Sequence, residues 1–489
     1  MPSARFGPLA LSIVAGAALP LAFAPVSWWW LAPFCYAALF HAWRDATPKQ
    51  AFRRGFVFGF AEFLLGIYWI VISVHEYGGA PVGIALFLML GLVTVMALYP
   101  ALVGWAAVRW LAQPLVAATG SGNASAAAGL GPRPALALLG TVPALFVVAE
   151  WIRGWFLTGF GWLAPGYTQT DSWLAGFAPL LGVHGVSWAL LVLAGGVALA
   201  VRGTGRERFA ATAVAVAIVA AAFVTDRIRW TEAKPAPLSV ALAQGAVSQE
   251  FRWVPEHLPE SLALYRALTS DALGSDLIVW PEAAIPDLYE NVRGYFAEIE
   301  ALAAAGGSEL MTGALRYHAP SGRAQNVLMT LGQPETVYVK RHLVPYGEYF
   351  PVPEFIEPWL SSMNILFPDL EPGEPDQPVI ELLGERIAVT ICYEDVFGAE
   401  QLYAFPDASL MINVSNDAWF GRSIAADQHL QIARMRSLEV RRPQLRATNT
   451  GITAVIDPFG RVVDALPPFE PGVLRATVTG VTGTTPYIF

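Results

Sequence analysis

Three polar residues, each at the end of an apolar run, have side chains that together could carry out acyl transfer. Glu282 follows the run L-I-V-W in D-L-I-V-W-P-E-A-A-I-P, residues 276–286. Lys340 ends V-Y-V-K, and Cys392 ends V-T-I-C. A thiolate is a strong nucleophile, a carboxylate can take the thiol proton, and an ammonium stabilises both a thiolate and an oxyanion. These residue types therefore predict nucleophilic catalysis by a cysteine.

Residue usage singles out the cysteine and the lysine. The chain has two cysteines, and the other one, Cys35, lies in an apolar stretch. Only three of its 30 basic residues are lysines. An ammonium on a flexible stem can follow a developing oxyanion better than a rigid guanidinium fork can. Glu348, in a turn bounded by glycine and proline, could fold back toward Lys340 and support it.

Each of these residues also has a non-catalytic interpretation. Glu282 could face water in a turn, Lys340 could form a surface ion pair, and Cys392 could be an inert buried cysteine. Their shared position argues against three coincidences, because strand ends in a layered α/β sheet meet at one rim. The seven histidines have no metal-binding spacing, so we expect no metal and no cofactor, and His342 is expected to support Lys340.

The second half of the chain has the pattern of an α/β domain. Short apolar runs alternate with segments of helical periodicity. Continuous apolar strands indicate a sheet covered on both faces, so helices must lie outside it. Strands are expected at 238–243, 276–280, 309–315, 326–331, 337–340, 386–392, 408–414, 445–456 and 472–478. Helices are expected at 257–273, 292–305, 397–405 and 424–440.

The two halves of the chain differ in charge. Residues 1–224 carry 11 basic and 6 acidic side chains, whereas residues 225–489 carry 19 basic and 33 acidic ones. An acidic second half without a basic stripe argues against nucleic acid as a partner, and two cysteines exclude a disulfide scaffold. We therefore predict a transmembrane domain over residues 1–224 and a catalytic domain over residues 225–489.

The first half has apolar runs long enough to cross a membrane. About seven spans are expected, at residues 8–24, 27–43, 55–74, 83–108, 134–150, 175–201 and 208–224. The first also resembles a signal peptide that ends at Ala22-Phe23-Ala24, and its removal would leave the later orientation unchanged.

Basic residues in the short loops predict the orientation, since such loops stay on the cytoplasmic side. With the N-terminus inside, the outer loops contain only Arg153. The cytoplasmic loops contain ten basic residues, which are Arg5, Arg44, Lys49, Arg53, Arg54, Arg109, Arg133, Arg202, Arg206 and Arg208. Residues from 225 onward are then expected outside the inner membrane, in the periplasm of a Gram-negative cell.

Longer motifs give the sequence a resemblance to a known family. W-P-E-A at 280–283, K-R-H-L-V-P-Y-G-E at 340–348 and C-Y-E at 392–394 are similar to the Glu–Lys–Cys motifs of the nitrilase superfamily. With a multi-span segment in front, the chain resembles the membrane-anchored apolipoprotein N-acyltransferase family. The similarity also covers E-W-I-R-G-W-F-L-T-G-F-G-W-L at 150–163, S-N-D-A-W-F-G at 415–421, Q-H-L-Q-I-A-R-M-R-S-L-E at 428–439 and R-A-T-N-T-G-I-T-A at 446–454.

This resemblance implies a fold and a reaction. The fold would be an α-helical multi-span membrane domain followed by a nitrilase-like α-β-β-α sandwich. Glu282 would deprotonate Cys392, which attacks the sn-1 acyl ester of a membrane phospholipid, while Lys340 and backbone N–H groups hold the oxyanion. The thioester acyl-enzyme would then pass its acyl group to the α-amine of the N-terminal S-diacylglyceryl-cysteine of an apolipoprotein, in a ping-pong scheme.

The resemblance also implies supporting and substrate-binding residues. Glu348 would orient Lys340, and Tyr393 and Glu394 would support the nucleophile. The residues implied to bind substrate are Trp253, Asn326, Arg153 and Trp162, with Phe350, Phe355 and Trp359 from an apolar loop at 349–367 that could enter the membrane or cover the acyl chain. The family has a final transmembrane helix after the catalytic domain, and this sequence ends at Phe489 without one. We expect a monomer.

Two other functions remain open at this point. A membrane-tethered nitrilase-like amidohydrolase or lipid hydrolase would use the same three residues and pass the acyl group to water. A transporter or receptor would use the outer domain only to bind a ligand. Charged residues in the apolar runs are few, with Glu62 the clearest, which is thin support for a translocation path.

Overall fold

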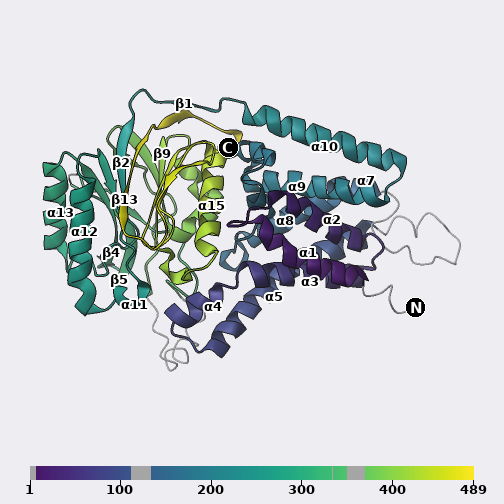
Figure 1. The fold of residues 1–489 in the computed structure, drawn as a ribbon, viewed down its shortest axis with the longest axis horizontal. Helices are drawn as coiled ribbons and strands as arrows, with labels where there is room; N and C mark the ends of the chain where they lie inside the picture. Colours follow the sequence, from purple (N-terminus) through teal and green to yellow (C-terminus); the bar gives the residue numbers. More distant parts are fainter. Residues whose placement is uncertain (1–6, 112–133, 333, 350–368) are drawn as a thin grey trace. The chain divides into compact units, whose positions relative to one another are not determined.

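The computed structural model describes residues 7–111, 134–332, 334–349 and 369–489, which form two compact units. One unit contains residues up to Ile70 and Gly83–Ile228, and the other contains Val71–Val82 and Arg229–Phe489. The first is helical, and the second contains the sheets (Figure 1).

The helical unit has helices over all seven of the expected apolar runs. Thr47 and Gln50 form a capping box at the start of α3, with each side chain accepting from the other's backbone N–H. In this unit α9 packs against α2, α8 and α10. The helices are α1 (Gly7–Ala18), α2 (Ala32–Trp43), α3 (Pro48–Gly66), α5 (Val82–Leu111), α7 (Pro134–Leu136), α8 (Val142–Arg153), α9 (Ala178–Arg202) and α10 (Gly205–Asp226).

Fewer of the described helices are long and apolar enough to cross a membrane than the seven spans expected from the sequence. Among the described residues, Val82–Trp110, Trp173–Arg202 and Gly205–Asp226 are helical, long and apolar enough to cross a membrane. A bent pair, Pro48–Gly66 with Ile70–Tyr77, would make a fourth if it counts as one span. The segment Gly7–Ala22 is apolar but shorter. The count of seven spans and the boundary at residue 224 stay predictions.

In the described part of the second unit the strands form two six-stranded sheets and a two-stranded one. One sheet has the order β13-β2-β3-β4-β5-β6, the other has the order β12-β11-β10-β9-β8-β7, and β1 pairs with β14. The strands of the first sheet are β13 (Gly472–Val478), β2 (Leu238–Gln244), β3 (Leu277–Val279), β4 (Glu309–His318), β5 (Arg323–Leu331) and β6 (Val337–Val339). Those of the second are β12 (Val462–Ala465), β11 (Ala454–Ile456), β10 (Gln444–Thr448), β9 (Leu410–Ser415), β8 (Glu385–Ile391) and β7 (Ile380–Leu382), and the separate pair is β1 (Thr231–Ala233) with β14 (Val481–Gly483).

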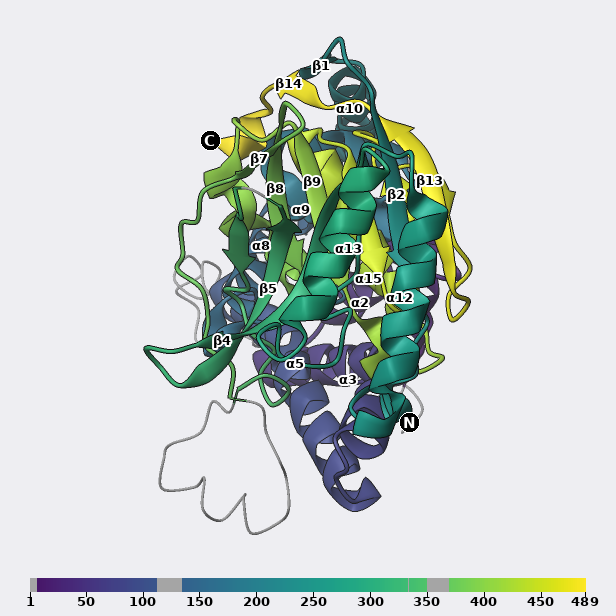
Figure 2. The same ribbon diagram turned by 90° about the vertical axis from the view of Figure 1, so that its left-hand side faces the viewer.

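Alternation along the strands produces the layers. In β2, Val240 and Leu242 belong to the core that the two sheets share, whereas Ala241 and Ala243 pack with the helices outside. Helices α12 (Leu258–Ala272) and α13 (Arg293–Ala305) lie side by side over that outer face (Figures 1 and 2). Helix α15 (Ala425–Val440) lies on the far side of the second sheet (Figure 1). The expected α-β-β-α sandwich is therefore confirmed.

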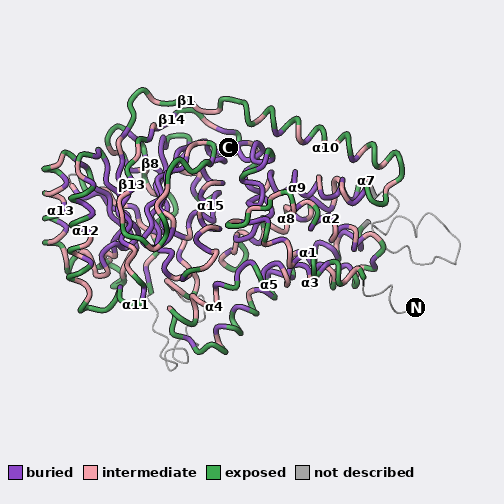
Figure 3. Tube along the Cα trace, viewed as in Figure 1, coloured by how far each residue is buried: buried purple, intermediate pink, exposed green. Residues whose placement is uncertain are grey.

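Burial follows these layers. The strands are mostly buried, while the outward faces of α12 and α13 are exposed (Figure 3). Two details differ from the sequence-based expectation. The expected strand at 445–456 is an antiparallel pair, β10 and β11, and the expected helix at 397–405 is a 3-10 helix, Gly398–Ala404.

Candidate active site

Strand direction brings the candidate residues to one edge of the first sheet. β2, β3 and β4 are parallel, and β6 runs the same way because it is antiparallel to β5, which is antiparallel to β4. Glu282 therefore follows the carboxyl end of β3 at the same edge where Lys340 follows β6. Cys392 directly follows β8 of the facing sheet.

Lys340 lies between two carboxylates. Its Nζ is 2.8 Å from Oε1 of Glu348 and 3.3 Å from Oε1 of Glu282, and its side chain is 1% exposed. Burial alone would lower the pKa of Lys340, but the carboxylates of Glu282 and Glu348, with Cys392, raise it above the usual range. Lys340 is therefore an ammonium. Asn326 completes the cluster, since its Nδ2 donates to Oε1 of Glu282 over 2.7 Å and to Oε1 of Glu348 over 3.2 Å.

The backbone around Glu282 is held from two sides. The buried guanidinium of Arg252 donates to the carbonyl oxygens of Glu282, over 2.9 Å, and of Ala283. On the other side the chain passes close to Gly313 of β4, where an added Cβ would lie 2.4 Å from the oxygen of Pro281 and 2.6 Å from Cα of Glu282. Only glycine allows this approach, so the position of the carboxylate depends on Gly313.

Cys392 occupies a strained turn. Its φ is +54°, a conformation that L-residues other than Gly, Asn and Asp rarely adopt. It begins the 3-10 helix Cys392–Val396 and is 7% exposed. Burial raises the pKa of the thiol, the Glu282 carboxylate raises it further, and the Lys340 ammonium opposes them. The resting sulphur is therefore a protonated thiol within electrostatic reach of a base and a cation.

Glu394 ties the cysteine turn to the lysine segment. Its Oε2 accepts from the Ile391 N–H over 2.7 Å, and its Oε1 accepts from the N–H groups of Arg341 and His342 over 2.7 and 3.2 Å. The Tyr338 hydroxyl donates to the same carboxylate over 3.1 Å. Burial raises the pKa of Glu394, and the donated N–H groups and Lys340 oppose that shift. One buried side chain thus fixes the residues on either side of the site.

An aromatic cluster lies next to this turn. The Tyr393 ring contacts Phe397 edge to face, with centroids 5.0 Å apart. His342 stacks on Phe397 at 3.6 Å, and its Nδ1 is 3.0 Å from Glu400. His342 also supports the lysine segment through its backbone N–H, as described for Glu394. Tyr393 therefore lies beside the site, packed rather than extended into solvent.

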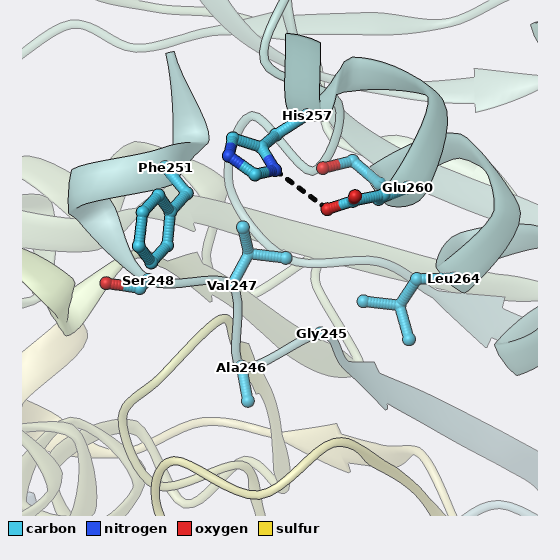
Figure 4. A pocket seen from close by; sticks show the side chains of 9 residues that line it. Gly245, Ala246, Val247, Ser248, Phe251, His257, Glu260 and Leu264 are labelled. Carbon is cyan, nitrogen blue, oxygen red and sulfur yellow. Dashed lines mark hydrogen bonds and ion pairs between the residues drawn. The ribbon is translucent and has the colours of Figure 1, made fainter. Parts of the chain in front are cut away.

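Trp253 follows Phe251 by two positions, and Phe251 lines a cavity of the same unit. It follows the short helix α11 (Gln249–Arg252), is 47% exposed, and has the Arg252 guanidinium 5.9 Å from its ring centroid. The cavity, of about 390 Å³, opens after β2, and Figure 4 shows the His257–Glu260 pair, 2.8 Å apart, at its wall with Phe251. It is lined mainly by Val247, Ser248, Phe251, His257, Glu260 and Leu264.

Of the other expected substrate-binding residues, three are not described by the structure and two belong to the helical unit. Phe350, Phe355 and Trp359 lie outside the described residues. Arg153 and Trp162 belong to the helical unit, where Arg153 is 1% exposed. The Arg153 guanidinium donates to the carbonyl oxygens of Phe160 and Trp162, over 2.6 and 2.7 Å, and pairs with Glu150. These contacts give Arg153 a structural role within its own unit.

Sequence reasoning assigned no role to a buried polar network behind the cysteine. His429 of α15 contacts the Cys392 carbonyl oxygen through Nε2, at 3.2 Å, and Asp417 through Nδ1, at 2.9 Å. Arg446 donates to the other oxygen of Asp417 over 3.1 Å. Burial would raise the pKa of Asp417, but His429 and Arg446 lower it to about 2. The available signal was that S-N-D-A-W-F-G, Q-H-L and R-A-T-N place polar residues where a layered fold has its core.

Within the described part of the chain, no group of three or more His, Cys, Asp or Glu side chains could hold a metal ion.

Comparison with known proteins decides the family. Residues 15–196 match the apolipoprotein N-acyltransferase N-terminal domain, and residues 239–487 match the carbon-nitrogen hydrolase family. The chain is 39% identical over 480 residues to an apolipoprotein N-acyltransferase of Methylococcus capsulatus, covering 98% of this chain and 91% of that protein. It is 40% identical over 487 residues to the one of Azotobacter vinelandii, covering 98% and 90%. The chain belongs to the apolipoprotein N-acyltransferase family.

Solved structures similar to this apolipoprotein N-acyltransferase family member include XC1258 of Xanthomonas campestris, a CN-hydrolase superfamily protein. It is 20% identical, with a TM-score of 0.37, and covers 50% of this chain and 91% of its own. The family match thus identifies an acyltransferase of lipoprotein biosynthesis, with apolar helices of membrane type before a nitrilase-like domain.

Proposed function

We propose that the chain transfers an sn-1 acyl group from a membrane phospholipid to the α-amine of the S-diacylglyceryl-cysteine at the N-terminus of an apolipoprotein. The observation that carries this proposal is the buried ammonium of Lys340, 3.3 Å from Glu282, with both residues within electrostatic reach of Cys392 at a strained strand end. Family membership supports the acceptor, because the relatives are named for it.

The first half-reaction forms a thioester. Among the described residues the contacts of the Glu282 carboxylate use Oε1, so Oε2 is the oxygen that takes the proton from Sγ of Cys392. The sulphur attacks the ester carbonyl, and the Lys340 ammonium with a backbone N–H after the cysteine stabilises the tetrahedral oxyanion. As the C–O bond breaks, Glu282 returns the proton to the lysophospholipid alkoxide, and the acyl group stays on sulphur.

The second half-reaction uses the same groups. The acceptor amine attacks the thioester carbonyl, and its proton passes to Glu282. The collapse of the tetrahedral intermediate breaks the C–S bond and expels the Cys392 thiolate, and Glu282 returns the proton to the sulphur as the amide product leaves. Asn326 and Glu348 keep Glu282 and Lys340 oriented through both steps. Two bulky lipid substrates can therefore use one site in turn.

We also propose which residues bind the substrates and where in the cell the protein lies. We propose that Trp253, Trp162, Phe350, Phe355 and Trp359 contribute to substrate binding. The protein would be a monomer in the bacterial inner membrane, with the second unit in the periplasm, where apolipoproteins present their N-termini. The excess of basic residues in alternate loops of the helical half supports this orientation.

Intact-mass measurement tests the proposal. The purified chain, incubated with phospholipid, should gain one acyl-sized adduct that hydroxylamine removes and that Cys392→Ser does not form. A synthetic diacylated lipopeptide should then clear the adduct and become N-acylated. Failure of the wild-type protein to form an adduct would overturn the proposal. Clearance at the same rate with and without lipopeptide would instead identify a hydrolase that passes the acyl group to water.

A further inference from the structure

The carbonyl oxygen of Cys392 has a buried histidine as its partner. His429 points Nε2 at this oxygen from α15, at 3.2 Å, and its other ring nitrogen points at Asp417 of the 3-10 helix Asp417–Phe420, at 2.9 Å. Both side chains are 1% exposed. This contact is made to the peptide bond between Cys392 and Tyr393, so His429 can fix the position of that peptide.

The partners on both sides of the imidazole are acceptors. A carbonyl oxygen has no proton to give. Asp417 is a carboxylate, because Arg446 donates to its second oxygen and its pKa is about 2. A neutral imidazole has one N–H, so it could satisfy only one of these two contacts. The ring can donate to both only when both nitrogens carry protons.

The cradle around Asp417 fits a fixed anion. Gly451 packs against the carboxylate so closely that an added Cβ would lie 2.1 Å from Oδ2. Ser415 donates to Oδ1 over 3.2 Å and also forms a side-chain hydrogen bond with Cys392. The charged groups that face His429 and its partner include Asp417 itself and Arg446 of β10, which also pairs with Asp395.

We propose that His429, held as an imidazolium by Asp417, is a positioning residue that fixes the Cys392–Tyr393 peptide and places a positive charge behind the nucleophile. The inference deepens the proposed function and rests on it for its effect on rate. Holding the carbonyl oxygen stabilises the turn at φ +54°, a conformation that is strained for a residue other than glycine. Because the peptide is planar, it also fixes the direction of the Tyr393 N–H.

Two variants distinguish hydrogen-bond donation by His429 from a role in packing alone. His429→Gln keeps a neutral donor to the carbonyl, whereas His429→Leu keeps volume without a donor. We expect the single-turnover rate of thioester formation at saturating phospholipid to fall about 10-fold in His429→Gln and 100-fold or more in His429→Leu. The phospholipid concentration for half-maximal rate should stay unchanged. Arg442→Gln is the matched control, because Arg442 is a buried polar residue just after α15 that holds backbone carbonyls at 408 and 483. It should lower Tm and leave the acylation rate of the folded protein unchanged.

Nitrogen NMR of protein labelled with ¹⁵N-histidine reads the ring directly. We expect both ring nitrogens of His429 to carry protons in the wild-type protein and one of them to be without a proton in Asp417→Asn. A neutral His429 ring in the wild-type protein would overturn the proposal, as would wild-type acylation by His429→Leu.

These readouts distinguish failure of this inference from failure of the proposed function. If the wild-type protein forms no acyl adduct, the proposed function fails, and the ring protonation still decides whether Asp417 holds an imidazolium. If the wild-type protein forms the adduct and His429→Leu forms it equally fast, the transferase stands and the role of His429 falls.

Discussion

The ammonium of Lys340 lies closer to Glu348 than to Glu282, 2.8 Å against 3.3 Å. Glu282 has a second donor, since its Oε1 also accepts from Nδ2 of Asn326 over 2.7 Å. Glu348 is itself fixed, because its Oε2 accepts from the Val344 N–H over 2.8 Å. Glu348 is therefore placed to stabilise the charge of Lys340, which leaves Glu282 for the proton transfer that we propose.

Replacing Glu348 should change both pH dependence and stability. Glu348→Gln removes one of the two carboxylates that raise the pKa of Lys340 against burial. A lysine whose pKa is raised on folding stabilises the fold below its unfolded pKa, and this contribution disappears as pH rises through the folded pKa. The free energy of unfolding of the variant should therefore be about 1.5–3 kcal/mol lower at pH 7. On the alkaline side of the pH profile, the variant should lose acyl transfer at a lower pH than the wild-type protein does. The measurements are thermal unfolding and a pH profile of the single-turnover rate.

Glu400→Gln is the control for Glu348. Glu400 is 43% exposed and pairs with His342 rather than with Lys340. Its replacement should therefore leave the alkaline side of the pH profile of acyl transfer unchanged. An unchanged alkaline limb in Glu348→Gln would show that Glu348 does not hold the lysine charge.

Thiol alkylation should respond in opposite directions to loss of the base and loss of the cation. Burial and Glu282 raise the pKa of Cys392, and Lys340 lowers it. At pH 8 the Cys392 thiolate fraction is then below that of a free cysteine. Glu282→Gln should increase the rate of iodoacetamide alkylation about 10-fold, one pKa unit, even though acylation is abolished. Lys340→Met should decrease the alkylation rate. Rates are read from intact mass, and a change of the same sign in both variants would contradict this electrostatic account.

The sequence predicted the site to the extent that the site depends on strand ends. Glu282, Lys340 and Cys392 follow apolar runs that are strands, and strand direction in a layered sheet places such residues at one edge. The layers were also predictable, because continuous apolar strands such as L-I-V-W at 277–280 indicate a sheet covered on both faces.

Contacts between segments far apart in the chain were not predictable. Glu394 accepts from Arg341 and His342, more than 50 positions earlier, and nothing local indicates that pairing. The φ of +54° at Cys392 is imposed by its surroundings, since local preference opposes it. The role of His429 likewise depends on which carbonyl its ring meets in the folded chain.

Glu394→Gln should destabilise the fold more than an ordinary surface change. Both carboxylate oxygens accept from backbone N–H groups, so the amide NH₂ of glutamine would face at least one donor. We expect a loss of about 1–3 kcal/mol in the free energy of unfolding and slower thioester formation. Chemical denaturation and single-turnover acylation measure these effects. Tyr338→Phe is the milder comparison, because it removes one donor and leaves the carboxylate. Equal stability of Glu394→Gln and wild type would refute the bridging role.

Two glycines of the same unit test whether Glu282 depends on the close contact between its backbone and β4. Gly313→Ala places a methyl group 2.4 Å from the oxygen of Pro281, so the segment that carries Glu282 must move. We expect acylation to fall at least 100-fold, with a loss of about 1–3 kcal/mol in stability. Gly294→Ala is the control, since its added Cβ meets nothing within 4 Å in α13, and it should stabilise the helix by about 0.5–1 kcal/mol. Retained activity in Gly313→Ala would show that the carboxylate does not depend on this approach.

Trp253 and Phe459 are both 47% exposed in the same unit, so they make a matched pair for substrate binding. Trp253 follows the helix whose Arg252 holds the Glu282 backbone, whereas Phe459 lies between β11 and β12. An exposed aromatic ring contributes little to folding but can bury a large apolar area against a lipid. Trp253→Ala should therefore raise the phospholipid concentration for half-maximal acylation about 10-fold, with Tm unchanged. Phe459→Ala should leave that concentration unchanged. Equal effects of the two substitutions would remove Trp253 from the substrate site and leave Glu282, Lys340 and Cys392 as they are.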